Sequence, residues 1–197
     1  MKLVFATGNK GKLKEASEIF KNWEIVSISD FTDNFDVEEN GSTFLQNAAI
    51  KAEAALKIVK NLPVLSDDSG LVVPALDGAP GIFSARFGGE QGNDFLNRKR
   101  LLEKMENIEE RGAYFTCSAF LLFPDYKVLS TEGRCYGEIG QKEFGTNGFG
   151  YDPIFIAKNH TQTIAEMESS AKNEISHRGI AFRKLEALLS CFQDFSE

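Results

Sequence analysis

Ser66-Asp67-Asp68-Ser69-Gly70 follows an apolar run, Leu62–Leu65, that has the composition of a buried strand. Two adjacent carboxylates at the end of such a strand are costly unless other groups compensate them. Neighbouring side chains of an extended chain point to opposite faces, so at most one of Asp67 and Asp68 can face a given cleft. The alternative is a turn in which Asp and Ser cap backbone N–H groups and Gly70 adopts a positive φ. These five residues alone favour neither interpretation.

The composition of the chain is that of an ordinary globular protein. Its 197 residues suit one domain, 1–197, with two lobes, and 42% of them are hydrophobic and 26% charged. No apolar run is long enough to cross a bilayer, and the N-terminal apolar run reaches Gly8-Asn9-Lys10 too soon for a signal peptide. We therefore expect a cytoplasmic protein with no membrane partner.

Cysteine, histidine and charge content restrict the ligands that we expect. The three scattered cysteines fit reduced thiols, and two histidines are too few for a histidine-rich metal centre. A bound metal would then have oxygen ligands, which favours Mg²⁺, with Mn²⁺ as the alternative. The net charge of −7 argues against a nucleic-acid surface but permits a small anionic ligand held by local lysines or a cation.

The first glycine-containing loop, Thr7-Gly8-Asn9-Lys10-Gly11-Lys12, separates a strand at 2–6 from an amphipathic helix. This order presents backbone N–H groups and a positive helix end to an anion. The loop has neither the P-loop spacing nor the dinucleotide-binding fingerprint, so a simple strand-to-helix turn remains the alternative.

The central part of the chain predicts a mixed sheet. We expect a short strand at 24–29, an acidic solvated loop at 30–41 and an amphipathic helix at 43–60. For Lys51, on that helix, a surface lysine is the alternative to a functional role. A helix at about 95–107 follows, with Asp94 as its expected cap. The long apolar strand at 113–123 and its return at 127–139 form a hairpin, which excludes a purely parallel sheet.

Two further segments carry features that secondary structure alone does not explain. The loop 145–153 places an aromatic residue, Phe149, between glycines that let backbone approach a flat ligand, although a tight turn with an aromatic plug is the alternative. Ser176 can cap a last helix with His177 and Arg178 in its first turn, where basic residues oppose the helix dipole. That inconsistency hints at function, against the alternative of a helix-end salt bridge.

Together these segments resemble the inosine/xanthosine triphosphate pyrophosphatase family, whose members act on non-standard purine nucleotides. The matching segments occur in the family's order: residues 7–12, residues 66–70, Gly78-Ala79-Pro80-Gly81-Ile82-Phe83-Ser84-Ala85-Arg86, residues 148–153 and residues 175–178. The chain departs from the family at Asn147, where glycine is common, and at Ala171, where an acidic residue is usual. The resemblance implies an elongated α/β fold of two lobes, with a central mixed sheet flanked by helices and an active-site cleft between the lobes. It also implies a homodimer that does not bind nucleic acid.

The activity implied by the resemblance is Mg²⁺-dependent hydrolysis of ITP, dITP and XTP to the monophosphate and pyrophosphate, which removes deaminated purines from the nucleotide pool. The metal ligands fall on Glu39 and Asp68, and Asp68 is also the catalytic residue. The remaining substrate contacts fall on Thr7, Gly8, Asn9, Lys10, Gly11, Lys12, Lys51 and Ser69 for phosphate and ribose, and on Phe149, Gly150, Tyr151, Asp152, Lys172, His177 and Arg178 for the base. On this assignment Arg178→Ala should raise KM for ITP and weaken discrimination against ATP.

Two other functions fit parts of this pattern. One is a related pyrophosphatase acting on modified pyrimidine nucleotides, against which the residues at 172–178 argue. The other is a nucleotide-binding sensor without turnover. Product analysis with ITP and magnesium separates them, because only the favoured function yields IMP and pyrophosphate.

Overall fold

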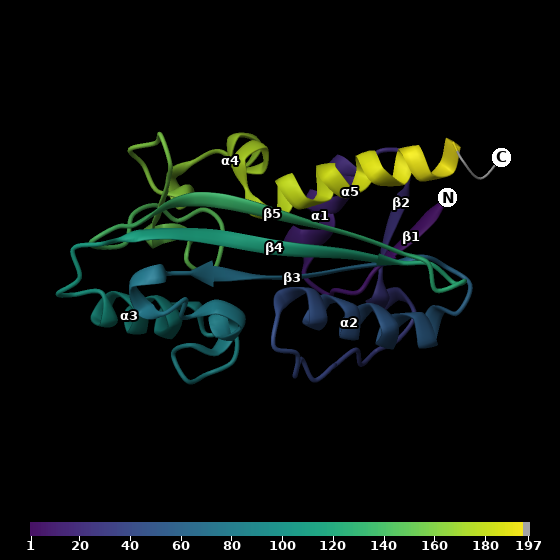
Figure 1. Ribbon diagram of the computed structural model, residues 1–197, viewed down its shortest axis with the longest axis horizontal. Coiled ribbons are helices and arrows are strands. Elements are labelled where there is room, and N and C mark those ends of the chain that lie inside the picture. Colours follow the sequence, from purple (N-terminus) through teal and green to yellow (C-terminus); the bar gives the residue numbers. More distant parts are fainter. Residues whose placement is uncertain (195–197) are drawn as a thin grey trace. The chain divides into compact units, whose positions relative to one another are not determined.

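The computed structural model describes residues 1–194 and contains a six-stranded mixed β-sheet with five α-helices (Figure 1). The strands are β1 (Lys2–Phe5), β2 (Glu24–Ser27), β3 (Val64–Val72), β4 (Gly112–Leu122), β5 (Val128–Ile139) and β6 (Phe155–Ala157), in the order β2-β1-β3-β4-β5-β6. β1 pairs parallel with β2 and β3, whereas β6 pairs antiparallel with β5. The predicted α/β class and mixed sheet are therefore confirmed.

The helices are α1 (Lys10–Ile19), α2 (Phe44–Val59), α3 (Asp94–Lys104), α4 (Ser169–Ile175) and α5 (His177–Asp194). None of the helices within residues 1–194 is both long and apolar enough to span a membrane. The chain divides into two compact units, and the divisions fall within β3, β4 and β5 and at the start of α5. Unit 1 comprises residues 1–68, 117–133 and 178 onward, and unit 2 comprises residues 69–116 and 134–177.

Unit 1 buries both faces of its part of the sheet. Alternate residues of β1 belong to different cores: Leu3 and Phe5 pack with α1 and α5, whereas Val4 packs with α2. Figure 1 shows α1 and α5 over one face of these strands and α2 over the other. A strand covered on both faces is expected to be apolar, as β1 is from Leu3 to Phe5. Any polar side chain in the middle of such a layer must then find a partner.

Unit 2 has a separate core, in which α3 and parts of four strands, β3 to β6, enclose aromatic side chains. Phe115 of β4 packs against Phe155 of β6 at a ring-centroid distance of 4.7 Å. Leu101 and Met105, at the end of α3, are fully buried in the same cluster. The predicted cleft between two lobes stays a prediction.

Some sequence expectations were wrong in detail. The turn interpretation of residues 66–70 fails because β3 runs without interruption through Gly70, whose φ is not positive. Asn93, not Asp94, caps α3, through its side-chain bond to the N–H of Leu96. Lys51 is not a surface residue, since its side chain is only 12% exposed.

The three cysteines are free thiols, as expected, with Cys117 and Cys135 buried and Cys191 exposed.

Candidate functional site

The two adjacent aspartates of β3 meet different surroundings, as the alternation of a strand requires. Asp67 faces α1 and α5, where its carboxylate accepts hydrogen bonds from Lys12 Nζ at 2.9 Å and Arg178 Nε at 3.2 Å. Asp68 faces α2, where it accepts a bond from Asn47 Nδ2 at 3.0 Å. A single strand thus presents one carboxylate to each of two separate polar clusters of unit 1.

The first cluster centres on the ammonium of Lys51. Its nitrogen lies 3.2 Å from Glu39 and 3.8 Å from Asp68, so the two carboxylates lie close together. Burial raises the pKa of Asp68, and the nearby Lys51 charge and the Asn47 hydrogen bond oppose this rise without cancelling it. The acidic loop that supplies Glu39 is held to the same helix, because Gly41 N donates to Asn47 Oδ1 at 2.8 Å.

This cluster has the chemistry to hold a divalent cation. The two carboxylates already flank a positive charge, and Mg²⁺ is usually bound by one or two carboxylates together with substrate phosphates and water. Within the described part of the chain no three His, Cys, Asp or Glu side chains gather into a metal site. A cation here would therefore depend on the substrate for further oxygen ligands.

The second cluster surrounds Asp67. Arg178, which is almost fully buried, donates through Nε to Asp67 and through Nη1 to Glu15 at 3.0 Å. Burial alone would raise the pKa of Asp67, but the charges of Lys12 and Arg178 hold it well below the ordinary aspartate range. The Cys117 thiol lies 3.8 Å from the same carboxylate, and burial followed by the Asp67 charge raises its pKa. This cluster is a fixed ion-pair network.

The first loop forms the N-terminus of α1, as the strand–loop–helix pattern predicts. Asn9 is the N-cap, and its side-chain oxygen accepts hydrogen bonds from Gly11 N at 2.8 Å and Lys12 N at 3.1 Å. Asn9 N in turn donates to Thr7 Oγ1 at 3.2 Å. An anion that uses the Gly11 and Lys12 amides would have to displace the Asn9 side chain. Lys10 is exposed at this helix end.

In unit 2, the second glycine loop presents an aromatic side chain beside a lysine. Phe149 is 41% exposed, and Lys172 Nζ lies 4.7 Å from the centre of its ring. Asp152 joins the two, because its carboxylate accepts from Lys172 Nζ at 2.8 Å and from Phe149 N at 3.0 Å. The Tyr151 hydroxyl is turned inward and donates to Ser84 O. A flat ring and a cation donor therefore stand side by side.

The end of the predicted base-binding set is divided between the units. His177 belongs to unit 2 and stacks on Phe115, with ring centroids 4.8 Å apart and an interplanar angle of 12°. Arg178 belongs to unit 1, in the Asp67 network. Ser69 follows Asp68 and begins the part of β3 that lies in unit 2. The alternative of a helix-end ion pair thus describes Arg178 correctly, while its assignment to base recognition stays a prediction.

Four side chains make contacts in or beside these clusters that sequence patterns did not indicate: Asn47, Glu15, Asp94 and Arg98. Asn47 could have been found from its spacing, since it lies one helical turn before Lys51 on α2. The other three have partners far away in the chain, which no local pattern reveals.

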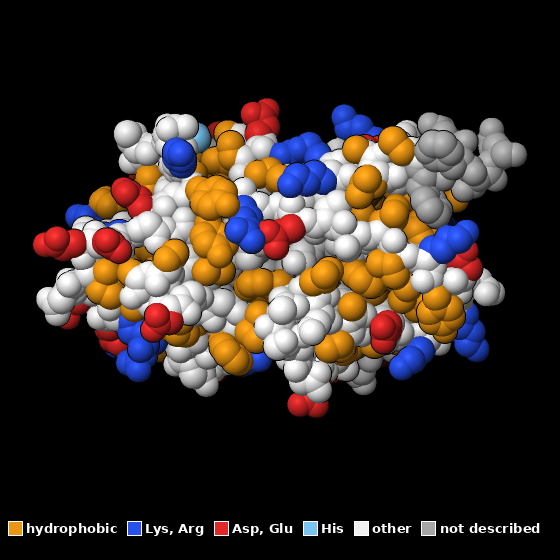
Figure 2. Space-filling model, viewed as in Figure 1, with side chains coloured by type: hydrophobic (Ala, Val, Ile, Leu, Met, Phe, Trp, Pro, Cys, Tyr) orange, Lys and Arg blue, Asp and Glu red, His pale blue; other side chains and the backbone are white. Residues whose placement is uncertain are grey.

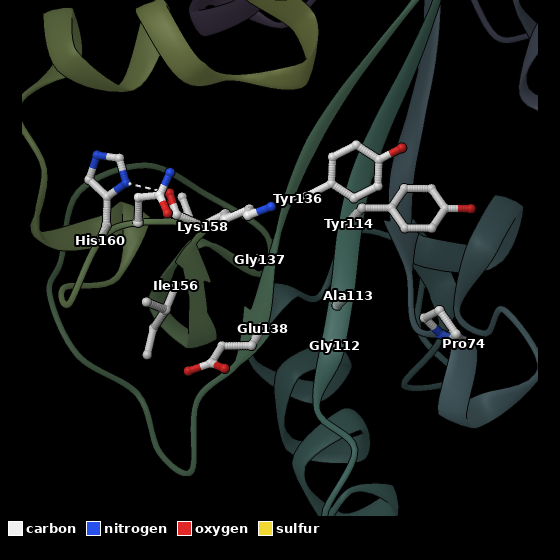
Figure 3. A pocket seen from close by; sticks show the side chains of 12 residues that line it. Pro74, Gly112, Ala113, Tyr114, Tyr136, Gly137, Glu138, Ile156, Lys158 and His160 are labelled. Atoms are coloured by element: carbon white, nitrogen blue, oxygen red, sulfur yellow. Dashed lines mark hydrogen bonds between the residues drawn. The ribbon is translucent and has the colours of Figure 1, made fainter.

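A separate pocket of about 550 Å³ in unit 2 contains none of the predicted site residues. Figure 3 shows the residues of β4, β5 and β6 that line it, with Tyr114 and Tyr136 beside each other. Their ring centroids are 5.5 Å apart. On the face drawn in Figure 2, basic and acidic side chains are both present, and no broad basic area is visible.

Comparison with known proteins identifies relatives over nearly the whole chain. A family model described as the Ham1 family matches residues 3–188. A dITP/XTP pyrophosphatase of Listeria monocytogenes is 44% identical over 189 residues, which cover 94% of this chain and 93% of the relative. A dITP/XTP pyrophosphatase of Staphylococcus aureus is 43% identical over 187 residues, 95% of each chain.

Solved structures agree with the sequence relatives. The Staphylococcus aureus Ham1 protein has a TM-score of 0.89 and 42% identity, covering 98% of this chain and all of that one. A nucleoside-triphosphatase / dITP/XTP pyrophosphatase from Mycobacterium abscessus has a TM-score of 0.78 and 41% identity, covering 96% of this chain and 99% of that one.

Proposed function

Because the chain belongs to the Ham1 family, we propose that it hydrolyses the deaminated purine nucleotides dITP, XTP and ITP to the monophosphate and pyrophosphate. The names of its relatives support this substrate class. The observation that carries the proposal is the position of Glu39 and Asp68 on either side of the Lys51 ammonium, in the unit that also contains the loop 7–12.

Residues of unit 1 provide positive charge that neutralises the negative charge of a bound triphosphate. Mg²⁺, or Mn²⁺ in its place, would be held by Glu39 and Asp68, and when bound it supplies positive charge to phosphate oxygens and acidifies water. Lys51 and Lys10 add ammonium groups, and Lys51 already lies between the carboxylates. Lys12 acts through its pair with Asp67, which keeps that part of the loop beside β3.

Asp68 is the base in this proposal. Its carboxylate takes a proton from the attacking water while the water oxygen bonds to the α-phosphorus. The bond between the α-phosphorus and the bridging oxygen breaks, and pyrophosphate leaves with the electron pair. The raised pKa of Asp68 suits this role, because a stronger base accepts the proton more readily.

The side chains of unit 2 recognise the base. Phe149 offers a face on which a purine can stack, and Lys172 is a cationic donor within 4.7 Å of that ring. Hypoxanthine and xanthine carry an acceptor oxygen at position 6 and a donor N–H at position 1, whereas adenine reverses both. Lys172 and His177 donate to the 6-oxygen, and Asp152 or backbone groups accept from the ring. Adenine would leave these groups unpaired, and such mismatches discriminate strongly.

Incubation of the chain with ITP and Mg²⁺, followed by analysis of the products, tests the proposal. We expect IMP and pyrophosphate in equal amounts, faster turnover of dITP and XTP than of ATP, and no turnover after EDTA treatment until Mg²⁺ is returned. Orthophosphate as the first product would indicate a phosphatase. Binding of ITP without any product would indicate a sensor, and preference for a modified pyrimidine nucleotide would favour the related pyrophosphatase.

A further inference from the structure

The peptide of Gly150, next to Phe149, is held on both sides by charged residues of α3. Gly150 N donates to Asp94 Oδ2 at 2.7 Å, and Gly150 O accepts from Arg98 Nη1 at 2.9 Å. Asp94 and Arg98 are four residues apart, so they lie on the same side of the helix. All of these residues belong to unit 2.

The loop needs such restraints because its own sequence provides few. Gly145, Gly148 and Gly150 all have positive φ, and glycine loses more conformational freedom on ordering than any other residue. No atom lies within 4 Å of the place where a Gly150 Cβ would stand, so side-chain packing does not fix this residue. The two hydrogen bonds from α3 fix it instead. Hydrogen bonds to charged groups are the stronger ones in proteins.

Both residues of α3 make contacts beyond their own helix. Asn93 caps α3, and Asp94, an acidic residue of its first turn, accepts a hydrogen bond from the Gly150 amide. The Arg98 side chain is only 14% exposed, and its Nε lies 3.1 Å from a Glu143 carboxylate oxygen, which neutralises part of its charge. Two partly buried, charged side chains thus hold the backbone N–H and C=O of one residue, Gly150.

We propose that Asp94 and Arg98 are positioning residues that determine how tightly the base is bound, by holding the Phe149–Asp152 segment in its binding geometry. This inference rests on the proposed function, since it assumes that Phe149 stacks on the base. Asp94 and Arg98 would then affect base binding although neither is among the residues proposed to touch the nucleotide. Loss of either side chain removes one of the two α3 hydrogen bonds to the Gly150 backbone, so the Phe149 ring is held less firmly, by the remaining bond and by the bond from Phe149 N to Asp152.

The test compares two probes, IMP and pyrophosphate, each titrated calorimetrically into the full chain with Mg²⁺. Asp94→Ala and Arg98→Ala should each weaken IMP binding about ten-fold, the effect of losing a hydrogen bond to a charged group, while pyrophosphate binding stays within two-fold. Asp94→Asn keeps an acceptor oxygen and should recover part of the affinity. Arg100→Ala is the matched control, because Arg100 is an exposed arginine of α3 that pairs with Glu103. Equal losses for both probes, or none, would overturn the inference.

Kinetics separate a positioning role from a general loss of structure. In the α3 variants KM for ITP should rise while kcat changes little. In a Phe149→Leu background, Asp94→Ala should add little to the rise in KM, because the ring through which it acts is already gone. An undiminished second rise would show that Asp94 acts by another route.

Hydrogen exchange of the 145–153 segment, followed by mass spectrometry, does not depend on turnover. Asp94→Ala and Arg98→Ala should speed exchange there and leave β1 unchanged, and Arg100→Ala should do neither. Unchanged exchange would overturn the inference even if ITP is hydrolysed. If the wild type fails to hydrolyse ITP, the proposed function fails, and the exchange data still decide whether α3 holds the loop.

Discussion

At the scale of single residues, Asp67 and Asp68 show how neighbouring identical side chains acquire opposite properties. Asp67 faces two cationic side chains, whereas Asp68 faces a cluster that contains a second carboxylate, Glu39. Asp67 is buried and Asp68 is partly buried, and burial raises the pKa of both, so the opposite net directions come from their neighbours. Asp67 is held ionised as a structural anion, whereas Asp68 keeps a basicity that is useful for proton transfer.

Substitution of Asp68 by Asn tests its role as the base. Because general-base catalysis typically contributes at least about a hundred-fold, kcat for ITP should fall by that factor or more, with KM changed little. Steady-state kinetics with ITP and Mg²⁺ measure both constants. Asp125→Asn, in the turn between β4 and β5, is a carboxylate control that should behave like the wild type. A loss of less than about a hundred-fold would place the base elsewhere.

Asp67→Asn should act mainly on stability. It leaves the buried Arg178 with one carboxylate fewer, and breaking a buried ion pair typically costs about 3–5 kcal/mol in the free energy of unfolding. Because the folded-state pKa of Asp67 is lowered, its contribution is fully present above the unfolded pKa of about 4 and is lost as the pH falls through the folded value. Urea unfolding should therefore show a difference in the free energy of unfolding between wild type and variant at pH 7, and this difference should become smaller below pH 4. A difference that does not depend on pH would show that Asp67 does not titrate as described.

At the scale of elements, α2 organises the cation cluster by presenting Asn47 and Lys51 one turn apart towards β3. Asn47 is buried and bonds both Asp68 and the backbone of the acidic loop, so it fixes the approach of two carboxylates to each other. Residues that orient metal ligands typically contribute ten- to a hundred-fold in affinity or activity.

We therefore expect Asn47→Ala to raise the Mg²⁺ concentration required for half-maximal ITP hydrolysis about ten-fold. A magnesium titration at saturating ITP measures this. Glu53→Gln, an exposed change on the same helix, is the control for a general effect on α2. If Asn47→Ala lost kcat at every Mg²⁺ concentration and kept the same half-saturation point, its role would be in the chemical step and not in holding the carboxylates.

Sequence patterns predicted the elements but not their long-range partners. The 3.6-residue periodicity gave α2 to within a residue or two, and the apolar runs gave β1 and the hairpin of β4 and β5. The turn-forming residues at 66–70 suggested a break in the strand, but pairing with neighbouring strands keeps β3 extended through them. Asp67 and Arg178 are 111 residues apart, so neither could indicate the other. For the same reason the bonds from α3 to Gly150 became visible only in the fold.

At the scale of the whole molecule, the predicted site residues separate into two chemical groups that coincide with the two units. Unit 1 contains the carboxylates and lysines assigned to phosphate and metal, and unit 2 contains the residues assigned to the base. Arg178 in unit 1 and Ser69 in unit 2 are the exceptions. The predicted homodimer is checked by light scattering on the purified chain at working concentration, where a mass near 21.8 kDa would exclude it.

The resemblance assigns both Lys172 and Arg178 to base recognition. Because the two residues lie in different units and different surroundings, we expect their substitutions to have different effects. Lys172 lies beside Phe149, so Lys172→Ala should raise KM for ITP about ten-fold and bring the kcat/KM values of ITP and ATP closer together. Arg178 is bound to Asp67 and Glu15, so Arg178→Ala should lower stability and kcat while the ratio of ITP to ATP stays within a few-fold of the wild type. Competition between the two nucleotides in one reaction measures that ratio directly. If Arg178→Ala reduced the ratio as strongly as Lys172→Ala does, its guanidinium would have to leave the carboxylates when nucleotide binds, and the direct base contact predicted from the sequence would be correct.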